Sequence, residues 1–187
     1  MAERVIAEAC RAHGMRAACL RYFNAAGADP DGDTGELHEP ETHLIPSVLR
    51  AAMTPGGAVD VFGDDYPTPD GTCIRDYVHV QDLCRAHLLA LDHVRQAGGF
   101  HVFNLGSGHG YSVAEVLARA RVLCEGRPIV RMQPRRAGDP AVLVASASRA
   151  EDALGWQPMH GLDDMLVSAL VWHRARMEMP GRADESR

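Results

Sequence analysis

The chain has 187 residues, of which 46% are hydrophobic and 24% charged, a composition typical of a globular protein. Its formal net charge of −6 argues against general nucleic-acid binding, because that function needs an excess of Lys and Arg to neutralise phosphates. No run of about 18 apolar residues occurs, so no membrane-spanning helix is expected. The N-terminal residues lack the unbroken apolar core of a signal peptide, and a cytoplasmic location is expected.

The cysteines and histidines are scattered rather than arranged in a metal-binding motif. Five cysteines occur at wide, irregular spacing without a CxxC pair, which is typical of the reduced thiols of a cytoplasmic protein. The ten histidines stand singly, and the zinc motif HExxH is absent. The sequence therefore predicts no metal site.

The first quarter of the chain predicts a helix, a buried strand, a long loop and a second helix. Met1–His13 has one apolar face, and Gly14 ends this helix. The near-continuous apolar run of residues 15–23 predicts a strand covered on both faces, as in a parallel sheet. Residues 24–42 form a polar loop of a length that is uncommon unless functional. Helical spacing then returns over His43–Met53.

Strands and helices alternate along the rest of the chain, which indicates α/β architecture. The helix that begins at Ser112 has Glu115 at the capping-box position. The predicted strands are Ala58–Phe62, Tyr77–Val80, Phe100–Leu105, Ile129–Met132 and Ala141–Ala145, and the other predicted helices are Val80–Val94, Ser148–Leu154 and Leu162–Met177.

The segment 64–82 carries the most informative pattern in the chain. It begins as a loop with two prolines and a glycine between acidic residues, and passes into the short alternating strand at Tyr77–Val80. Arg75 stands at the junction of loop and strand. A rigid loop that brings one cation to a strand end suits recognition of a phosphate group.

A second turn-rich loop contains the pair Arg135 and Arg136. If one of these guanidinium groups converges with that of Arg75, they can grip a diphosphate, each charge-assisted bond contributing about 1.5–3 kcal/mol. The alternatives are solvated surface arginines, or an ion pair with Asp76 or Asp139.

Two predicted strand ends carry residues that could face a ligand. Asn24 follows a strand directly, where an amide can bind a ligand or form an Asx-turn. The loop Gly106–Gly110 resembles a dinucleotide fingerprint, but Tyr111 stands where the last glycine of G-x-G-x-x-G is needed. The glycine loop is therefore interpreted as a tight strand-to-helix turn.

Four segments in order, LRYFNAAGADP, PTPDGTCIRDYVHVQDL, HVFNLGSGHGYSV and PRRAGDPAVLVA, carry a resemblance. Together they resemble the C-terminal half of the UDP-glucose 4-epimerase family, within the extended short-chain dehydrogenases/reductases. The resemblance runs from Met1 to about Trp172. It implies NAD-dependent interconversion of UDP-glucose and UDP-galactose through a 4-keto intermediate, as in galactose metabolism.

The resemblance implies an incomplete NAD(P)-binding Rossmann-like α/β fold: the last strands of the parallel sheet and the smaller substrate-binding domain. Residues 1–23 would be a remnant of the dinucleotide-binding domain, 24–180 the nucleotide-sugar-binding portion and 181–187 a tail. Strand 100–105 would return to the main sheet. The apolar strand 15–23 would then leave an exposed edge, which predicts aggregation or dimerisation.

The family's catalytic tyrosine and lysine belong to a Tyr-x-x-x-Lys pair in its first half, which also carries the glycine-rich NAD loop. This sequence has neither motif and no lysine at all. The resemblance therefore implies a truncated chain whose catalytic residues lie upstream of Met1. It also implies NAD as cofactor and a homodimer for the complete enzyme. The alternatives are a non-catalytic UDP-sugar-binding remnant, a partner of a separate N-terminal chain, or a UDP-xylose/UDP-arabinose 4-epimerase.

Matching positions in the motifs imply where the UDP-sugar binds. Arg75 and Arg136 would grip the diphosphate and Asp139 the uridine ribose, while Asp60 and Phe62 lie on the strand that holds uracil. The full set implied for the UDP-sugar is Asn24, His43, Leu44, Asp60, Phe62, Arg75, Arg136, Asp139 and Leu143.

The other implied positions lie near the phosphates, near the sugar and beside the cofactor. Asn24 would contact the phosphate region, and the backbone of His43 and Leu44 would lie near the diphosphate. Leu143 takes a place near the sugar where some members have a tyrosine, which bears on acceptance of N-acetylated sugars. The cofactor positions would be Tyr22 and Phe23, with Phe23 beside the nicotinamide.

Overall fold

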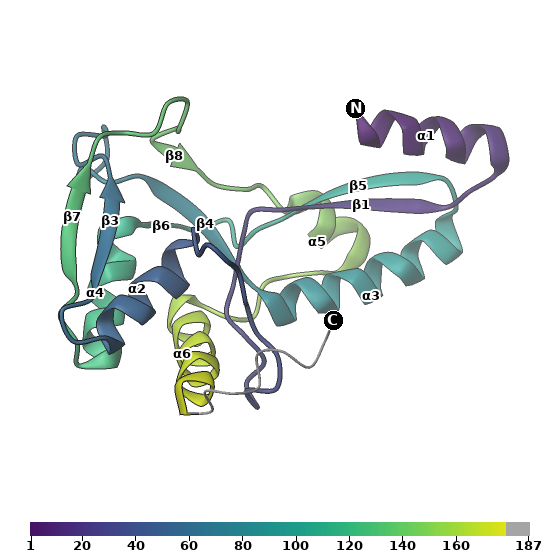
Figure 1. Cartoon of the computed structure of the whole chain (residues 1–187). Helices are drawn as coiled ribbons and strands as arrows, with labels where there is room; N and C mark the ends of the chain where they lie inside the picture. Colours follow the sequence, from purple (N-terminus) through teal and green to yellow (C-terminus); the bar gives the residue numbers. More distant parts are fainter. Residues whose placement is uncertain (179–187) are drawn as a thin grey trace.

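The structure, a computed structural model, describes residues 1–178 and has α/β architecture (Figure 1). The predicted tail, 181–187, lies outside these residues. The elements follow in the order α1 (Ala2–His13), β1 (Ala17–Tyr22), β2 (Asn24–Ala26), α2 (Leu44–Met53), β3 (Ala58–Phe62), β4 (Ile74–His79), α3 (Val80–Ala97), β5 (Phe100–Leu105), β6 (Gly110–Ser112), α4 (Val113–Cys124), β7 (Ile129–Gln133), β8 (Val142–Leu143), α5 (Ser148–Leu154) and α6 (Leu162–Glu178).

The strands form three pieces of sheet in which parallel pairing dominates. Strand β1 pairs with β5, and β3 pairs with β7, both in parallel. Between them β4 pairs in parallel with β2 and β8 and antiparallel with β6. In Figure 1 the β1–β5 pair extends away from β3 and β7, with α1 and α3 on its two sides. None of the described helices is long and apolar enough to cross a membrane.

Two hydrophobic cores flank β4. The larger contains buried side chains of α2, α4 and α6 with those of β3, including Leu49, Val116 and Met165. The second packs α3 and α5 against β5 around Phe103 and Trp156. Apolar stripes on the helices and alternation along the strands account for both cores.

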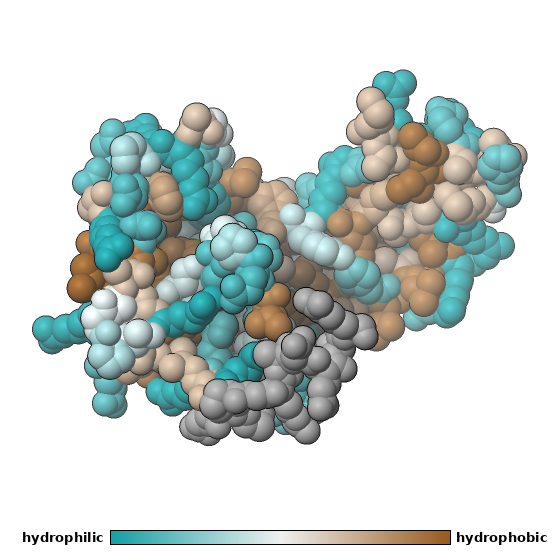
Figure 2. Space-filling model, viewed as in Figure 1, coloured by the Kyte–Doolittle hydropathy of each residue, from teal (hydrophilic) through white to brown (hydrophobic). Residues whose placement is uncertain are grey.

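Strand β1 differs from the expectation of burial on both faces. Its six residues are half-buried or exposed, and Tyr22 is 45% exposed. Among the described residues β5 is the only strand that pairs with β1, so its other edge has no strand beside it. Figure 2 shows apolar side chains at the surface of this arm, where Val5, Met15 and Leu88 are exposed.

The other predicted elements are found with small shifts. The loop expected over residues 24–42 begins with the short strand β2, which pairs with β4. Strand β4 starts three residues before the predicted Tyr77 and ends at His79. Only Val142–Leu143 of the strand expected over 141–145 forms. The capping box of Ser112 and Glu115 is present at the start of α4.

The carboxylate of Asp76 is fully buried and holds three parts of the chain together. One oxygen accepts hydrogen bonds from the backbone N–H and the hydroxyl of Ser107, both at 2.7 Å. The other accepts from the N–H groups of Gly108 and Ala145, each at 3.0 Å. A Cβ on Gly106 would lie 2.6 Å from the Asp76 carboxylate, so glycine permits the close approach. The glycine loop was predicted as a tight strand-to-helix turn, but it connects β5 to the short strand β6 (Gly110–Ser112), and helix α4 begins only after that strand.

A second buried polar group, His79, joins the loop after β2 to α6. The Gln81 N–H donates to Nδ1 of His79 at 3.1 Å, so Nε2 carries the proton and faces the Ser168 hydroxyl at 3.0 Å. The same hydroxyl accepts from the Ala28 N–H at 3.1 Å. Gly27 has a φ of +85°, and a Cβ there would lie 2.7 Å from Nε2 of His79. The backbone and His79 therefore pack without room for a side chain.

Replacing Asp76 should destabilise the fold strongly. Asp76→Ala leaves buried N–H groups without an acceptor, and we expect a loss of roughly 3–5 kcal/mol in the free energy of unfolding. Urea denaturation followed by circular dichroism measures this loss. The control Asp92→Ala removes an exposed carboxylate on α3, paired only with Arg95, and should change stability by less than about 0.5 kcal/mol. Equal losses in the two variants would contradict this account of Asp76.

Stability should also fall between about pH 7.5 and 5.5. Burial lowers the pKa of His79, and burial together with Arg50 lowers the pKa of His173. The unfolded chain therefore takes up protons first, and the free energy of unfolding decreases as the pH falls through about 6.5. Urea midpoints across this range measure the slope. His79→Gln should reduce it, whereas His13→Gln, a change on exposed α1, should leave it unaltered.

Candidate functional site: a cavity beside strand β4

A cavity of about 1130 Å³ opens where β2, β3, β4, the start of α2 and the loop 134–139 meet. Sites for small molecules occupy roughly 300–1,000 Å³, so the space is sufficient for a nucleotide-sized ligand. Side chains alternate along β4, so Arg75 and Tyr77 line the cavity, together with Cys73 just before the strand. Asp76 and Val78 are fully buried away from it. Burial raises the pKa of the Tyr77 hydroxyl, which stays protonated at neutral pH.

The loop before β4 is fastened at several points. The Tyr66 N–H donates to the Gly71 carbonyl at 2.8 Å, and a Cβ on Gly71 would lie 2.1 Å from the Asp64 carbonyl oxygen. Asp70 accepts from the N–H and the hydroxyl of Thr72, at 2.9 and 2.7 Å. Its other oxygen accepts from the hydroxyl of Ser112, the cap of α4. Arg75 therefore follows a loop whose path is set by its own hydrogen bonds.

Arg75 is held in one orientation at the cavity wall. Its Nη1 donates to the carbonyls of Ile74, at 2.8 Å, and Pro140, at 2.9 Å. Its Nη2 donates to Asp139, so the ion pair foreseen as an alternative forms, with Asp139 and not Asp76. Only 11% of the Arg75 side chain is exposed. A guanidinium fixed in advance loses little further entropy when it binds an anion.

The neighbouring arginines of the loop after β7 point to different places. The guanidinium carbon of Arg136 lies 4.0 Å from the centre of the Phe62 ring, and both residues line the cavity. Arg135 instead stacks at 4.3 Å on Tyr66 and donates through Nε to Asp65 at 2.5 Å. The structure thus brings Arg136 to the same cavity as Arg75.

Most of the remaining predicted residues line the same cavity. Phe23, Asn24, His43, Leu44 and Asp60 all do so. Asn24 begins β2 opposite Tyr77, and its side chain forms no hydrogen bond within the described residues, so no Asx-turn forms. A carboxylate oxygen of Asp60 accepts from Nε2 of Gln133 at 3.0 Å.

Two predicted residues lie outside the cavity lining. The Tyr22 hydroxyl meets Nε2 of His87 at 2.5 Å, on the arm formed by β1 and α3. Leu143 pairs in register with Arg75 on β8 and is 45% exposed. Their assigned roles, beside a cofactor and a sugar, stay predictions.

The sequence missed several cavity residues. Tyr77 could have been found, because it shares the face of β4 with Arg75. Trp172 had no local signal, since α6 joins the wall only through tertiary packing. Its Nε1 donates to the Glu36 carbonyl at 2.9 Å, and a Cβ on Gly35 would lie 2.5 Å from the indole. Trp172 thereby holds the long loop against the cavity.

The family model described as NAD dependent epimerase/dehydratase family matches residues 1–106, more than half of the chain. The chain belongs to this family of NAD-dependent enzymes. Two of its curated relatives are UDP-glucose 4-epimerases, which are isomerases. The one from Halalkalibacterium halodurans is 52% identical over 165 residues, which cover 87% of this chain and 49% of the relative. That from Lactobacillus helveticus is 48% identical over 176 residues, covering 94% and 53%.

Solved structures agree with this assignment. A UDP-glucose 4-epimerase from Stenotrophomonas maltophilia, with bound NAD and formylated UDP-arabinopyranose, matches with a TM-score of 0.88 and 41% identity, covering 95% of this chain and 53% of that one. The Bifidobacterium longum enzyme in complex with NAD+ and UDP matches with a TM-score of 0.81 and 38% identity, covering 95% and 52%. The chain spans about half the length of the curated relatives it matches.

The glycine loop 106–110 is not free to bind a cofactor pyrophosphate. It connects β5 to β6 and directs the N–H groups of Ser107 and Gly108 at the Asp76 carboxylate. A second anion cannot use the same donors. Phe23, predicted beside the nicotinamide, lines the large cavity.

Proposed function

We propose that this chain is the nucleotide-sugar-binding portion of a UDP-glucose 4-epimerase-like enzyme, and that by itself it binds the UDP-sugar without transforming it. The enzyme's reaction would be the NAD-dependent interconversion of UDP-glucose and UDP-galactose. The chain would supply the last strands of the main parallel sheet, β1 and β5, and the smaller substrate-binding domain. Residues 1–23 would belong to the first part and 24–180 to the second.

The observation that supports the proposal is that Arg75 and Arg136, which are far apart in sequence, line the same cavity. Two guanidinium groups suit the two phosphates of a nucleoside diphosphate, because each offers a planar fork of donors. The two Nη1 N–H groups of Arg75 and one of its Nη2 N–H groups are used by the Ile74 and Pro140 carbonyls and by Asp139, so the Nε–H and the second Nη2 N–H are the donors that a phosphate would take.

The opposite wall suits the nucleoside. Asp60 and Phe62 are alternate residues of β3 and both line the cavity, and Phe62 supplies an aromatic ring beside Arg136. Asp139 would bind the ribose hydroxyls, for which a carboxylate is a strong acceptor. Asn24, with His43 and Leu44 at the start of α2, would surround the phosphates.

Two kinds of sugar, a hexose and a pentose, are candidates for the UDP-sugar. The Stenotrophomonas maltophilia relative was solved with a formylated UDP-arabinopyranose, and that favours a UDP-pentose as the second candidate. A pentose and a hexose differ only by a hydroxymethyl group, so the uridine diphosphate contacts would be the same. A substrate panel on a complete enzyme carrying this sequence would separate UDP-glucose, UDP-arabinose and UDP-N-acetylglucosamine.

Affinity for UDP should depend on Arg75 and not on Arg135. Arg75→Ala removes charge-assisted hydrogen bonds to the diphosphate, and we expect UDP to bind roughly 10- to 100-fold more weakly. Isothermal titration calorimetry with UDP measures the change, with Arg75→Lys expected to retain part of the affinity.

Arg135→Ala is the matched control, because this arginine is the neighbour of Arg136 but pairs with Asp65. It should bind UDP as the unaltered chain does. A loss in Arg135→Ala as large as in Arg75→Ala, or no loss in either, would overturn the assignment of the cavity.

The 187-residue chain supplied with NAD+ should not interconvert UDP-galactose and UDP-glucose. It contains no lysine, so it cannot offer the family's Tyr-x-x-x-Lys pair. A coupled assay that detects UDP-glucose measures the turnover, and any rate above the protein-free control would refute the proposal. Turnover that arises only on adding a separate N-terminal chain would favour the two-chain alternative.

A further inference from the structure

We propose that His38, Glu41 and His43 form a binding site for a divalent transition-metal ion, and that their ligand chemistry suits zinc. The three residues lie where the long loop after β2 runs into α2, and His43 is the residue before the first turn of that helix. One ligand atom from each lies within 4.8 Å of the other two.

The geometry needs only small side-chain movements to hold an ion. Nδ1 of His38 lies 4.0 Å from a carboxylate oxygen of Glu41, and Nδ1 of His43 lies 3.9 Å from the same oxygen. Zinc bonds of about 2.0–2.1 Å in tetrahedral geometry place ligand atoms about 3.3 Å apart. Each histidine nitrogen must therefore approach the Glu41 oxygen by about 0.7 Å, and the rings of His38 and His43 are exposed.

Charge favours a cation at this place. The Glu41 side chain is only 8% exposed, and Glu36 contacts His43 beside it. Within the described residues, the only basic groups within ion-pair distance of these two carboxylates are the imidazoles of His38 and His43. Two carboxylates, Glu36 and Glu41, therefore lie beside His43 in a partly buried space, and a divalent ion would balance their charge.

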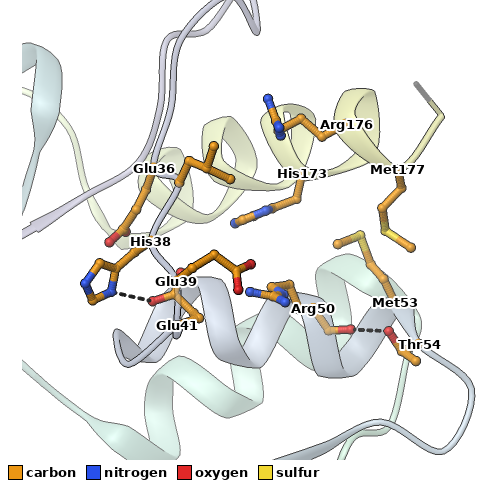
Figure 3. A pocket seen from close by; sticks show the side chains of 11 residues that line it. Glu36, His38, Glu39, Glu41, Arg50, Met53, Thr54, His173, Arg176 and Met177 are labelled. Carbon is orange, nitrogen blue, oxygen red and sulfur yellow. Dashed lines mark hydrogen bonds and ion pairs between the residues drawn. The ribbon is translucent and has the colours of Figure 1, made fainter. Parts of the chain in front are cut away.

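Figure 3 shows Glu36, His38 and Glu41 together at one end of a smaller cavity of about 250 Å³. Arg50 and Arg176 also line this cavity but form no ion pair with the carboxylates within the described residues. Glu36 contacts Nδ1 of His43. A metal ion bound to His38, Glu41 and His43 would lie next to Glu36, which would have to release His43 to let Nδ1 bind the ion.

The combination of two imidazole nitrogens with carboxylate oxygens is the reason for choosing zinc. Zinc accepts His and Glu ligands in a four-coordinate site, whereas calcium and magnesium prefer oxygen alone. The three residues have the spacing H-x-x-E-x-H, which differs from the HExxH motif. From the sequence alone no metal site was expected.

A bound ion would join the long loop to α2. The same loop carries the Glu36 carbonyl that accepts from Trp172, and Glu36, Glu41 and His43 also line the large cavity. The ion would therefore stabilise one wall of that cavity, as a structural rather than a catalytic metal.

Zinc titration of the chelator-treated, fully reduced 187-residue chain tests the proposal. Calorimetry with ZnCl₂ alone should show one strong site, and zinc should raise the thermal unfolding midpoint. His38→Ala and His43→Ala should each weaken zinc binding at least about tenfold and abolish the thermal shift. The control His109→Ala, at an exposed histidine of the glycine loop, should change neither.

Binding through the cysteines is the competing outcome. The spectrum of the chain loaded with Co²⁺ in place of zinc distinguishes the two, because thiolate ligands add a sulfur-to-metal charge-transfer band that nitrogen and oxygen ligands lack. The absence of that band, together with the two histidine effects, is the expected result. No zinc binding, a charge-transfer band, or full affinity in both histidine variants would overturn the proposal.

Discussion

The buried carboxylate of Asp76 is the constraint on which the arrangement around β4 depends. A carboxylate without water must receive hydrogen bonds, and Asp76 draws them from the glycine loop and from Ala145. Those bonds bring the turn after β5 and the segment after β8 to the strand, although they are far apart in sequence. They also set which way β4 faces. With Asp76 turned to the loops, strand geometry directs Arg75 and Tyr77 to the opposite side, where the cavity lies.

The alternation of side chains along β4 therefore explains both features. The N–H groups of the glycine loop donate to the buried Asp76 carboxylate. Arg75, the residue before Asp76, faces the cavity, where the anion of a ligand could bind. Asp139 completes the arrangement by holding Arg75 in place with the carbonyls of Ile74 and Pro140. The consequence is a rigid cation at the cavity wall, because the bonds of Nη1 and Nη2 within the chain fix the guanidinium, and with it the remaining N–H groups, before a ligand arrives.

Much of this could be predicted from the sequence, because it depends on local patterns. Helix α5 is found at Ser148–Leu154 as expected, and the capping box of Ser112 marks the start of α4. Local patterns could not show which partner Arg75 takes, since Asp76 and Asp139 differ only in three-dimensional placement. Nor could they show that Trp172 closes the cavity, or that residues of the long loop meet at His43. The open edge of β1 was expected from the resemblance, but burial on both faces was wrong for a related reason: an apolar run indicates a strand, and its cover depends on neighbours elsewhere.

The opposite directions of Arg135 and Arg136 limit the changes in length that this part of the chain can tolerate. Strand β7 ends at Gln133, pinned to Phe62 by the ladder with β3, so the loop begins from a fixed point. A change in length between Gln133 and Arg135 would therefore move Arg136 away from Phe62 and Arg135 away from Asp65 and Tyr66, because both positions are measured from that fixed point.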